Sequence, residues 1–342
     1  MLIFMKEALY YEALADQQVR CGLCHHGCII RCGRRGICGV RENRDGRLYS
    51  LVYGRLTAEA VDPIEKKPLY HFLPGSTSFS VATRGCNFRC LHCQNCTISQ
   101  VTSDVPLNRD RETAPQQLVA VARGMGCKSI SYTYTEPTIF YEYALDTARL
   151  AAAAGLKNVF VTNGYITPDP LREIAPVLDA ANIDLKFFDE KMYREVCGAH
   201  LQPVLDTIGL YYELGIWIEI TTLIIPEHND DDEQLRKIAE FIAGLDTAIP
   251  WHVTGFYPVY KLQHVPPATV AMLRRARRIG YETGLKNVYT GNLPDDEGCT
   301  TYCPECRAEL IVRGGRRALV SSGFDGVCEE CGGRLAGVFA TN

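Results

Sequence analysis

The chain has 342 residues and a formal net charge of −4, with 46% hydrophobic and 22% charged residues. This composition is typical of a globular protein and allows one large α/β domain with small appendages, or two ordinary domains. The charge offers no electrostatic argument for nucleic acid or an anionic membrane as the main partner.

The hydrophobic residues occur in short stretches. No run of about 18 apolar residues appears, so we expect no membrane span. The N-terminus, "MLIFMKEALYYEALADQQ", has a short apolar start that Lys6 and Glu7 follow at once. It lacks the ordered charged, apolar and small-residue regions of a signal peptide, and we therefore expect a cytoplasmic protein.

The sixteen cysteines are clustered: fourteen of them fall within residues 21–38, 86–96 and 299–331. Disulfides do not require such clustering, whereas a metal site needs several ligands close together. We therefore interpret the three groups as three metal sites. Cys127 and Cys197 lie apart from them, and we expect both to be packing residues, because lone buried thiols behave as small hydrophobes.

The first expected unit, residues 1–75, is an N-terminal metal-binding segment. Its stretch "CGLCHHGCIIRCGRRGIC" contains five thiols and two imidazoles, which exceed the four positions of one metal site. We prefer the ligand set Cys21, Cys24, Cys28 and Cys38. Either zinc or an auxiliary [4Fe–4S] cluster is compatible with four thiolates, and we place zinc slightly ahead.

The second expected unit, residues 76–292, alternates strand and helix, a pattern that predicts a parallel sheet. The expected strands cover residues 78–84, 129–136, 158–164, 182–189, 217–226 and 251–258. The expected helices cover residues 113–126, 139–155, 169–181, 203–215, 231–244 and 267–284, with Thr113 and Asp230 as N-caps. These are six βα units, and "NVYTGN" after them adds a short edge strand.

Six units are too few for a closed eight-stranded barrel, and periodicity leaves two layouts open. One is a doubly wound open sheet, and the other is an incomplete barrel whose open side admits a large substrate. In both layouts, ligands bind at the carboxyl ends of the strands. Polar residues occupy those positions here, among them Glu136, Asn163, Asp184, Lys186 and Tyr257.

The central cysteine group, Cys86-x3-Cys90-x2-Cys93, follows the first strand of this unit. A structural zinc site has no reason to lie at the catalytic end of a sheet. Three thiolates can instead hold three irons of a cubane and leave the fourth iron open for a ligand. Cys96 then follows as a non-ligand, because a fourth thiolate would close that position.

The third expected unit, residues 293–342, is a zinc ribbon. Two C-x2-C pairs, separated by 21 residues, give four thiolates for a tetrahedral zinc ion: Cys303, Cys306, Cys328 and Cys331. Residues 308–315 and 318–324 between the pairs are expected to form short hairpin strands, and Cys299 is surplus. A redox pair of C-x2-C motifs is the alternative. In a ribbon of this size the metal supplies most of the folding energy.

The C-x3-C-x2-C spacing, with Phe88 before its second cysteine and His92 beside its third, resembles the radical S-adenosylmethionine (SAM) superfamily. "TYTEP", with Thr135 and Glu136, stands where that superfamily has an acidic motif, which implies that Glu136 holds the amino group of SAM. The resemblance implies that Asn163 lies near the ribose and adenine. Asp184 and Lys186 resemble the Asp-x-Lys of glycyl-radical-enzyme activases, although an ordinary ion pair is the alternative.

The stretch from "YGRLTAEAVDPIEKK" to "RGCNFRCLHCQN" and the terminal "TYCPEC…CEECGGRLAGV" are similar to the AmmeMemoRadiSam-system radical SAM enzymes, relatives of the pyruvate formate-lyase activating enzymes. The similarity covers nearly the whole chain, but Cys32 and Cys96 depart from it. It implies a partial (β/α)6 barrel of the radical SAM type between the two cysteine-rich ends. It also points to Memo-like and AMMECR-like proteins as partners.

The resemblance implies an oxidoreductase that cleaves SAM with an electron from ferredoxin or flavodoxin and abstracts hydrogen from a substrate that the sequence does not identify. An activase that installs a glycyl radical on a partner enzyme is one alternative. A zinc-dependent interaction module without chemistry is another. The run 62–72, "DPIEKKPLYHF", is either a solvated linker turn or a wall over the cluster, with Lys66 or Lys67 facing an anionic substrate.

Overall fold

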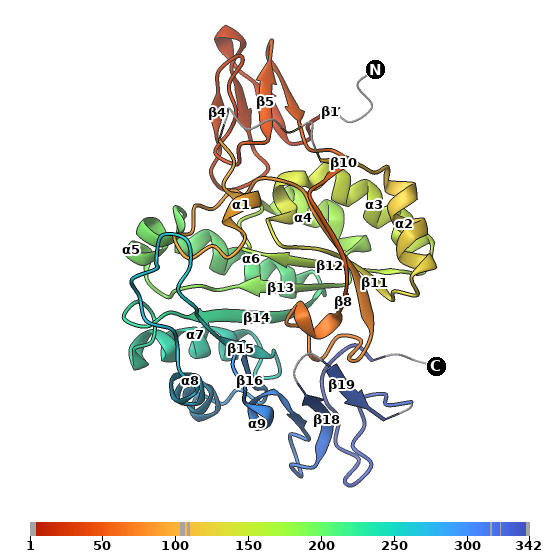
Figure 1. The fold of residues 1–342 in the computed structure, drawn as a ribbon, viewed down its shortest axis with the longest axis vertical. Helices are drawn as coiled ribbons and strands as arrows, with labels where there is room; N and C mark the ends of the chain where they lie inside the picture. Colours follow the sequence, from red (N-terminus) through yellow and green to blue (C-terminus); the bar gives the residue numbers. More distant parts are fainter. Residues whose placement is uncertain (1–4, 103–106, 108–109, 315–316, 322, 340–342) are drawn as a thin grey trace.

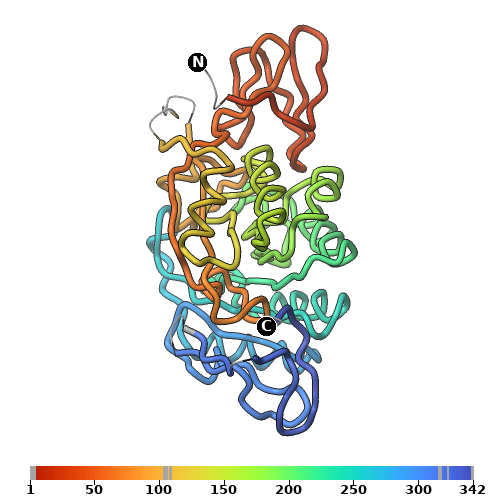
Figure 2. The backbone as a smooth tube through the Cα atoms, turned by 90° about the vertical axis from the view of Figure 1, so that its right-hand side faces the viewer, coloured from red at the N-terminus to blue at the C-terminus, as the bar shows by residue number. Residues whose placement is uncertain are grey.

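The structure is a computed structural model that describes residues 5–102, 107, 110–314, 317–321 and 323–339. Expectations for residues 1–4, 315, 322 and 340–342 lie outside this range. A central sheet separates the N-terminal cysteine-rich segment, at one end of the long axis, from the C-terminal segment at the other (Figures 1 and 2). Within the described residues, no helix has the length and apolarity to cross a bilayer.

The central sheet has eight strands, and seven of them are parallel and follow one another in chain order. They are β9 (Thr77–Ala82), β11 (Ser129–Tyr132), β12 (Lys157–Thr162), β13 (Ala180–Asp184), β14 (Trp217–Ile224), β15 (Trp251–Gly255) and β16 (Val288–Gly291). A doubly wound sheet would reverse its strand order at a switch point. The sequential order excludes that layout, and the predicted parallel sheet is confirmed.

The remaining strand, β8 (Ala58–Pro63), pairs antiparallel with β9 at the edge of the sheet. It extends the sheet upstream of the parallel strands. The expected edge strand at the other side is confirmed as β16, which pairs with β15.

Helices connect the parallel strands as the sequence pattern predicts. They are α2 (Pro115–Gly124), α3 (Tyr141–Ala153), α4 (Pro168–Ile174), α6 (Leu201–Glu213), α7 (Asp232–Leu245) and α8 (Val270–Glu282), and the short α9 (Asp296–Cys299) follows β16. The helix expected over 169–181 ends at Ile174, because Pro176 cannot continue it, and Ala180 already belongs to β13.

Two predicted N-caps are wrong. Helix α2 is capped at Ala114, whose backbone N–H donates to Gln117 Oε1 at 3.1 Å, and Thr113 lies one residue upstream. Helix α7 is capped by Asp231, whose Oδ1 accepts from Gln234 N at 2.9 Å, instead of by Asp230. Both errors are shifts of one residue, which a run of similar polar residues does not resolve.

The N-terminal segment consists of two small antiparallel sheets. One contains β1 (Lys6–Glu7), β5 (Arg41–Arg44) and β6 (Arg47–Ser50), and the other contains β2 (Tyr11–Ala13), β3 (Val19–Cys21) and β4 (Ile29–Ile30). A further pair joins β7 (Arg55–Leu56) to β10 (Arg111–Glu112). The segment is anchored by buried Arg41, whose guanidinium donates to both carboxylate oxygens of Glu142 on α3, at 2.9 and 3.1 Å.

The C-terminal segment contains a three-stranded antiparallel sheet of β17 (Thr301–Tyr302), β18 (Glu309–Gly314) and β19 (Arg317–Val320). Buried polar contacts attach this segment to the central sheet. Arg313 donates to Tyr70 O at 2.7 Å and lies 4.0 Å over the Tyr70 ring. His71 Nδ1 lies 2.7 Å from Ala336 O and His71 Nε2 lies 2.5 Å from Tyr289 Oη.

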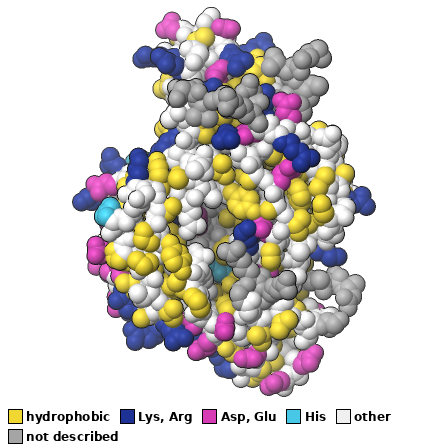
Figure 3. All heavy atoms as spheres, in the orientation of Figure 1, with side chains coloured by type: hydrophobic (Ala, Val, Ile, Leu, Met, Phe, Trp, Pro, Cys, Tyr) yellow, Lys and Arg dark blue, Asp and Glu magenta, His cyan; other side chains and the backbone are white. Residues whose placement is uncertain are grey.

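The charges of the surface are mixed. On the face drawn in Figure 3, lysine and arginine side chains stand singly or in small groups among acidic ones, without a continuous basic stripe among the residues described there. This distribution agrees with the small net charge of −4.

The burial of His71 makes stability depend on pH. Burial lowers the pKa of His71 to about 4, well below the ordinary histidine value of about 6.5. Between these values the unfolded chain binds a proton that the folded protein does not, so the free energy of unfolding should fall as pH drops through this window. We expect this residue to account for about 3 kcal/mol of the loss between pH 7 and pH 4.

Chemical denaturation of wild type and His71→Gln at several pH values measures this effect. Wild type should be the more stable protein at pH 7, and the difference between the two should shrink as the pH approaches 4. A difference that stays constant over this range would contradict the assigned burial.

Candidate active site and metal centres

The cluster loop, residues 83–95, follows β9 and rests on the N-terminal segment. Gly85 has a φ of 97°, and a Cβ on it would lie 2.7 Å from both Cys38 O and Val40 Cγ1. Only glycine combines this conformation with so close a contact. The position of Cys86 is therefore fixed by contact between two parts of the chain that are distant in sequence.

Backbone hydrogen bonds hold the rest of this loop. Arg89 N donates to Cys197 O at 2.8 Å and Leu91 N donates to Val196 O at 2.9 Å, both in the π-helical turn Tyr193–Cys197. The Asn95 side chain donates to Tyr134 O at 2.6 Å. Cys86 and Cys90 are buried and Cys93 is partly buried, while Cys96 begins the short helix α1 (Cys96–Ser99). Three thiols are thus presented on a loop with fixed ends.

The three thiols do not form a compact group of metal ligands in this structure. Among the described residues, the one group of three or more potential metal ligands within 4.8 Å of one another lies elsewhere, in the C-terminal segment. At least one pair of sulfur atoms from Cys86, Cys90 and Cys93 is therefore farther apart than 4.8 Å. Thiolates around a single zinc are about 3.8 Å apart, from the Zn–S distance and tetrahedral geometry. A cubane separates its thiolates further, because the irons lie between them.

Glu136 connects the ends of two strands. Its buried Oε1 accepts from Thr138 N, Thr138 Oγ1 and Thr162 Oγ1 at 3.0, 2.6 and 2.8 Å, and its Oε2 accepts from Asn163 N at 2.8 Å. Burial raises the pKa of Glu136, and these donors offset part of that rise. Oε2 accepts one hydrogen bond here and keeps a further acceptor position.

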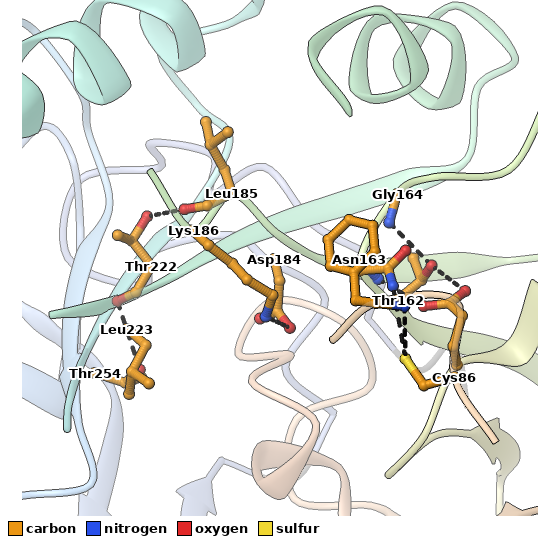
Figure 4. A network of polar contacts seen from close by, with 12 residues as sticks. Cys86, Thr162, Asn163, Gly164, Asp184, Leu185, Lys186, Thr222, Leu223 and Thr254 are labelled. Atoms are coloured by element: carbon orange, nitrogen blue, oxygen red, sulfur yellow. Dashed lines mark hydrogen bonds and ion pairs between the residues drawn. The ribbon is translucent and has the colours of Figure 1, made fainter. Parts of the chain in front are cut away.

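Asn163 carries this connection to the cluster loop. Its Nδ2 donates to Asn87 Oδ1 at 2.7 Å and lies 4.0 Å from Cys86 Sγ (Figure 4). The sequence did not single out Asn87, because an asparagine between a cysteine and a phenylalanine has no distinctive spacing. The ends of these two strands and the cluster loop therefore form one polar network.

Asp184 and Lys186 lie at the end of β13, between Asn163 and Thr222 in Figure 4, and form an ion pair with a 2.7 Å Nζ–Oδ2 distance. Burial alone would lower the pKa of Lys186, but Asp184 and the thiols of Cys90 and Cys197 raise it well above its usual value. Lys186 is thus a cation beside the cluster loop.

His92 is a neutral neighbour of this cation. Burial, together with Lys186 and His228, lowers the pKa of His92 to about 3. No partner is seen for its Nδ1 within the described part of the chain. The cluster loop therefore carries an uncharged imidazole whose Nδ1 has no partner among the described residues.

The other two residues expected to bind the cofactor, Phe88 and Thr135, contact neighbouring parts of the protein. Phe88 is buried with its ring edge-on to Tyr165 and Tyr193, at centroid distances of 5.2 and 6.4 Å. Thr135 Oγ1 donates to Thr83 O at 2.9 Å and so fastens the strand end to the cluster loop.

The run 62–72 is structured, and its interpretation as a solvated linker turn is wrong. Ile64 and Lys67 are buried. Asp62 accepts from Lys66 at 2.7 Å, from Lys67 at 2.6 Å and from Ser80 at 2.8 Å, and also from Tyr134. The two lysines are therefore paired with Asp62 in this structure.

The C-terminal cysteines form a compact group. The sulfur atoms of Cys303, Cys306, Cys328 and Cys331 all lie within 4.8 Å of one another, with 3.6 Å between two of the pairs. This spacing fits one tetrahedral metal ion. Cys299 lies outside the group and donates to Arg313 O at 3.2 Å.

The cysteines of the N-terminal segment are divided by the fold. Cys21, Cys24, Cys28 and Cys38 line one cavity, together with Asn87 of the cluster loop. Cys32 is exposed, and its thiol donates to Asp45 at 3.5 Å. Cys127 and Cys197, expected to be packing residues, are both buried in the hydrophobic core.

Residues 80–242, which carry the three-thiol loop and the strand ends around it, match the family described as the radical SAM superfamily. The chain therefore contains a radical SAM domain. A radical SAM domain implies a [4Fe–4S] cluster and SAM. The wide spacing of Cys86, Cys90 and Cys93 and the acceptor position on Glu136 fit these two groups.

Relatives of this radical SAM chain include an uncharacterized protein of Methanocaldococcus jannaschii, 50% identical over 90% of this chain and 92% of the relative. The pyruvate formate-lyase-activating enzyme of Clostridium pasteurianum is 23% identical over 52% of this chain and 77% of that enzyme. The enzyme of the same name from Streptococcus mutans is 22% identical over 59% of this chain and 83% of that enzyme.

The contact between Gly85 and Cys38 gives a test of how the cluster loop is held. Gly85→Ala should lower the free energy of unfolding by about 1–3 kcal/mol, because alanine is strained at this φ and its Cβ meets two neighbours. The amount of iron that Gly85→Ala binds after anaerobic reconstitution should also be lower than that of wild type. The matched control is Gly124→Ala at the exposed end of α2, where a Cβ meets nothing within 4 Å.

Denaturant titration and iron analysis of both variants measure the difference. Gly124→Ala should retain the iron of wild type and its stability. If the two variants had equal stability and equal iron content, the cluster loop would not depend on its contact with the N-terminal segment.

Proposed function

We propose that the chain is a radical SAM enzyme in which Cys86, Cys90 and Cys93 hold the [4Fe–4S] cluster and Cys96 is not a ligand. The observation that carries this proposal is the three-thiol loop, which is joined through Asn87 and Asn163 to Glu136. When bound, the cluster supplies one electron to the sulfonium of SAM, which yields methionine and a 5′-deoxyadenosyl radical that takes a hydrogen atom from substrate.

The residues of the chain orient SAM in this proposal. Glu136 accepts from the methionine amino group through the acceptor position left on Oε2, while Asn163 N holds that oxygen in place at 2.8 Å. Asn163 and the loop after β14 lie toward the ribose and adenine. Thr135 and Phe88 fix the loop from which the thiols project.

The reaction requires a low-potential electron donor such as ferredoxin or flavodoxin, and the protein is expected to work in the cytoplasm. The sequence similarity to AmmeMemoRadiSam-system enzymes supports Memo-like and AMMECR-like proteins as partners. We assign zinc to the C-terminal group, since four cysteine sulfurs within 4.8 Å match one tetrahedral ion. Its role is to hold the ribbon fold together.

A second candidate function is activation of a glycyl-radical enzyme, with a backbone glycine of the partner as substrate. The Asp184–Lys186 pair beside the cluster loop supports it, as does the similarity to pyruvate formate-lyase-activating enzymes. A glycyl-radical doublet that appears in the electron paramagnetic resonance spectrum of a partner enzyme, only when this protein and SAM are present, would favour this function.

Reductive cleavage of SAM is the direct test of the proposed function. Anaerobically reconstituted protein given SAM and dithionite should release 5′-deoxyadenosine. Cys90→Ala should reduce this release to background, because a three-thiol site cannot lose a ligand and keep its open iron. Cys96→Ala should release as much as wild type.

The same assay, read by chromatography, separates the alternatives. If Cys90→Ala releases as much 5′-deoxyadenosine as wild type, the cluster assignment is wrong. If Cys96→Ala loses the cluster, the fourth cysteine is a ligand and the open-iron proposal fails. An interaction module without chemistry predicts no release from any of the three proteins.

A further inference from the structure

Four of the five cysteines of the N-terminal segment line one cavity, which the radical SAM reaction as described does not use. Cys21 lies at the end of β3, Cys24 and Cys28 in the loop that follows, and Cys38 before β5. The cavity contains about 330 Å³ of space free of atoms, with its open mouth included.

The spacing of these sulfurs argues against a single metal ion. No three of the four belong to a group whose ligand atoms lie within 4.8 Å of one another, although all four residues are in the described range. The C-terminal cysteines of the same chain do form such a group. The N-terminal cysteines are therefore less tightly grouped than the C-terminal ones.

The cavity is also lined by hydrogen-bond donors that lack acceptors. Asn87 and Arg41 are 0% and 2% exposed, and neither Asn87 Nδ2 nor Arg41 Nε has a partner among the described residues. Their other polar atoms are engaged: Asn87 Oδ1 by Asn163, and the two terminal nitrogens of Arg41 by Glu142 and Leu9 O.

A buried donor without a partner destabilises the folded protein. Two such donors on one cavity indicate an anionic occupant with several acceptor atoms. Thiolates and inorganic sulfides of an iron–sulfur cluster accept hydrogen bonds of this kind, and such bonds tune the cluster. The remaining lining is largely apolar, with Leu23, Ile30, Ile37 and Ile139, as suits a cofactor shielded from water.

We propose that Cys21, Cys24, Cys28 and Cys38 hold a second [4Fe–4S] cluster, with Asn87 and Arg41 donating hydrogen bonds to its sulfur atoms. This assignment replaces zinc, which the sequence alone had placed slightly ahead. Four protein thiolates occupy all four irons, so this cluster has no open position for SAM. His26 also lines the cavity, but its Nε2 is hydrogen-bonded to Asn87 O at 2.8 Å.

The test isolates this site from the SAM site. Cys86, Cys90 and Cys93 are all changed to alanine in one variant, which is reconstituted anaerobically with ferrous iron and sulfide. It should retain about four irons and four sulfides per chain, against about eight of each in wild type. After reduction, its electron paramagnetic resonance spectrum should show a cluster signal that SAM does not alter.

Further changes in the same background assign the ligands. Adding Cys38→Ala should lower the iron content, because it removes one of the four thiolates, and adding Cys32→Ala, the exposed control, should leave it unchanged. Cys28→Ala, at a less buried position, repeats the test if the Cys38 variant does not fold.

Two results would overturn the proposal. One is a triple variant that binds no iron but two zinc ions per chain, which would make the N-terminal site a zinc site. The other is an iron content that survives the loss of both Cys28 and Cys38. Neither result bears on SAM cleavage by wild type, so this inference and the proposed function fail separately.

Discussion

The arrangement of the cysteine sites depends on the contact between Gly85 and the backbone of Cys38. Because Gly85 has no side chain and a φ of 97°, the cluster loop can lie against the N-terminal segment at a distance that any Cβ would prevent. This contact fixes Cys86 relative to the sheet and brings Asn87 to the wall of the N-terminal cavity. Two groups of cysteines that are far apart in the sequence thus share one loop residue.

Buried charge is satisfied by hydrogen bonds throughout this region, as the low polarity of a protein interior requires. Glu136 accepts four hydrogen bonds from three residues, and Lys186 is paired with Asp184. Two buried donors without a partner among the described residues, Asn87 Nδ2 and Arg41 Nε, belong to residues that line the cavity of the N-terminal cysteines. Unpartnered donors beside cysteine thiols are what a protein with bound clusters should show.

The features that could be predicted from the sequence are those that local patterns determine. Strand–helix alternation predicted the parallel sheet, and the spacing of Cys303, Cys306, Cys328 and Cys331 predicted the compact group at the C-terminus. The sequence did not predict the pairing of Lys66 and Lys67 with Asp62, the role of Asn87 or the size of the N-terminal site. These depend on contacts between distant segments, and neither periodicity nor spacing carries that information.

The central claim is that one iron of the cluster on Cys86, Cys90 and Cys93 is open and binds SAM. Electron–nuclear double resonance on the anaerobically reduced protein, with SAM carrying nitrogen-15 in its amino group, tests it directly. The account predicts a hyperfine coupling between that nitrogen and the reduced cluster, which Cys90→Ala abolishes. Bound SAM without such a coupling would contradict it.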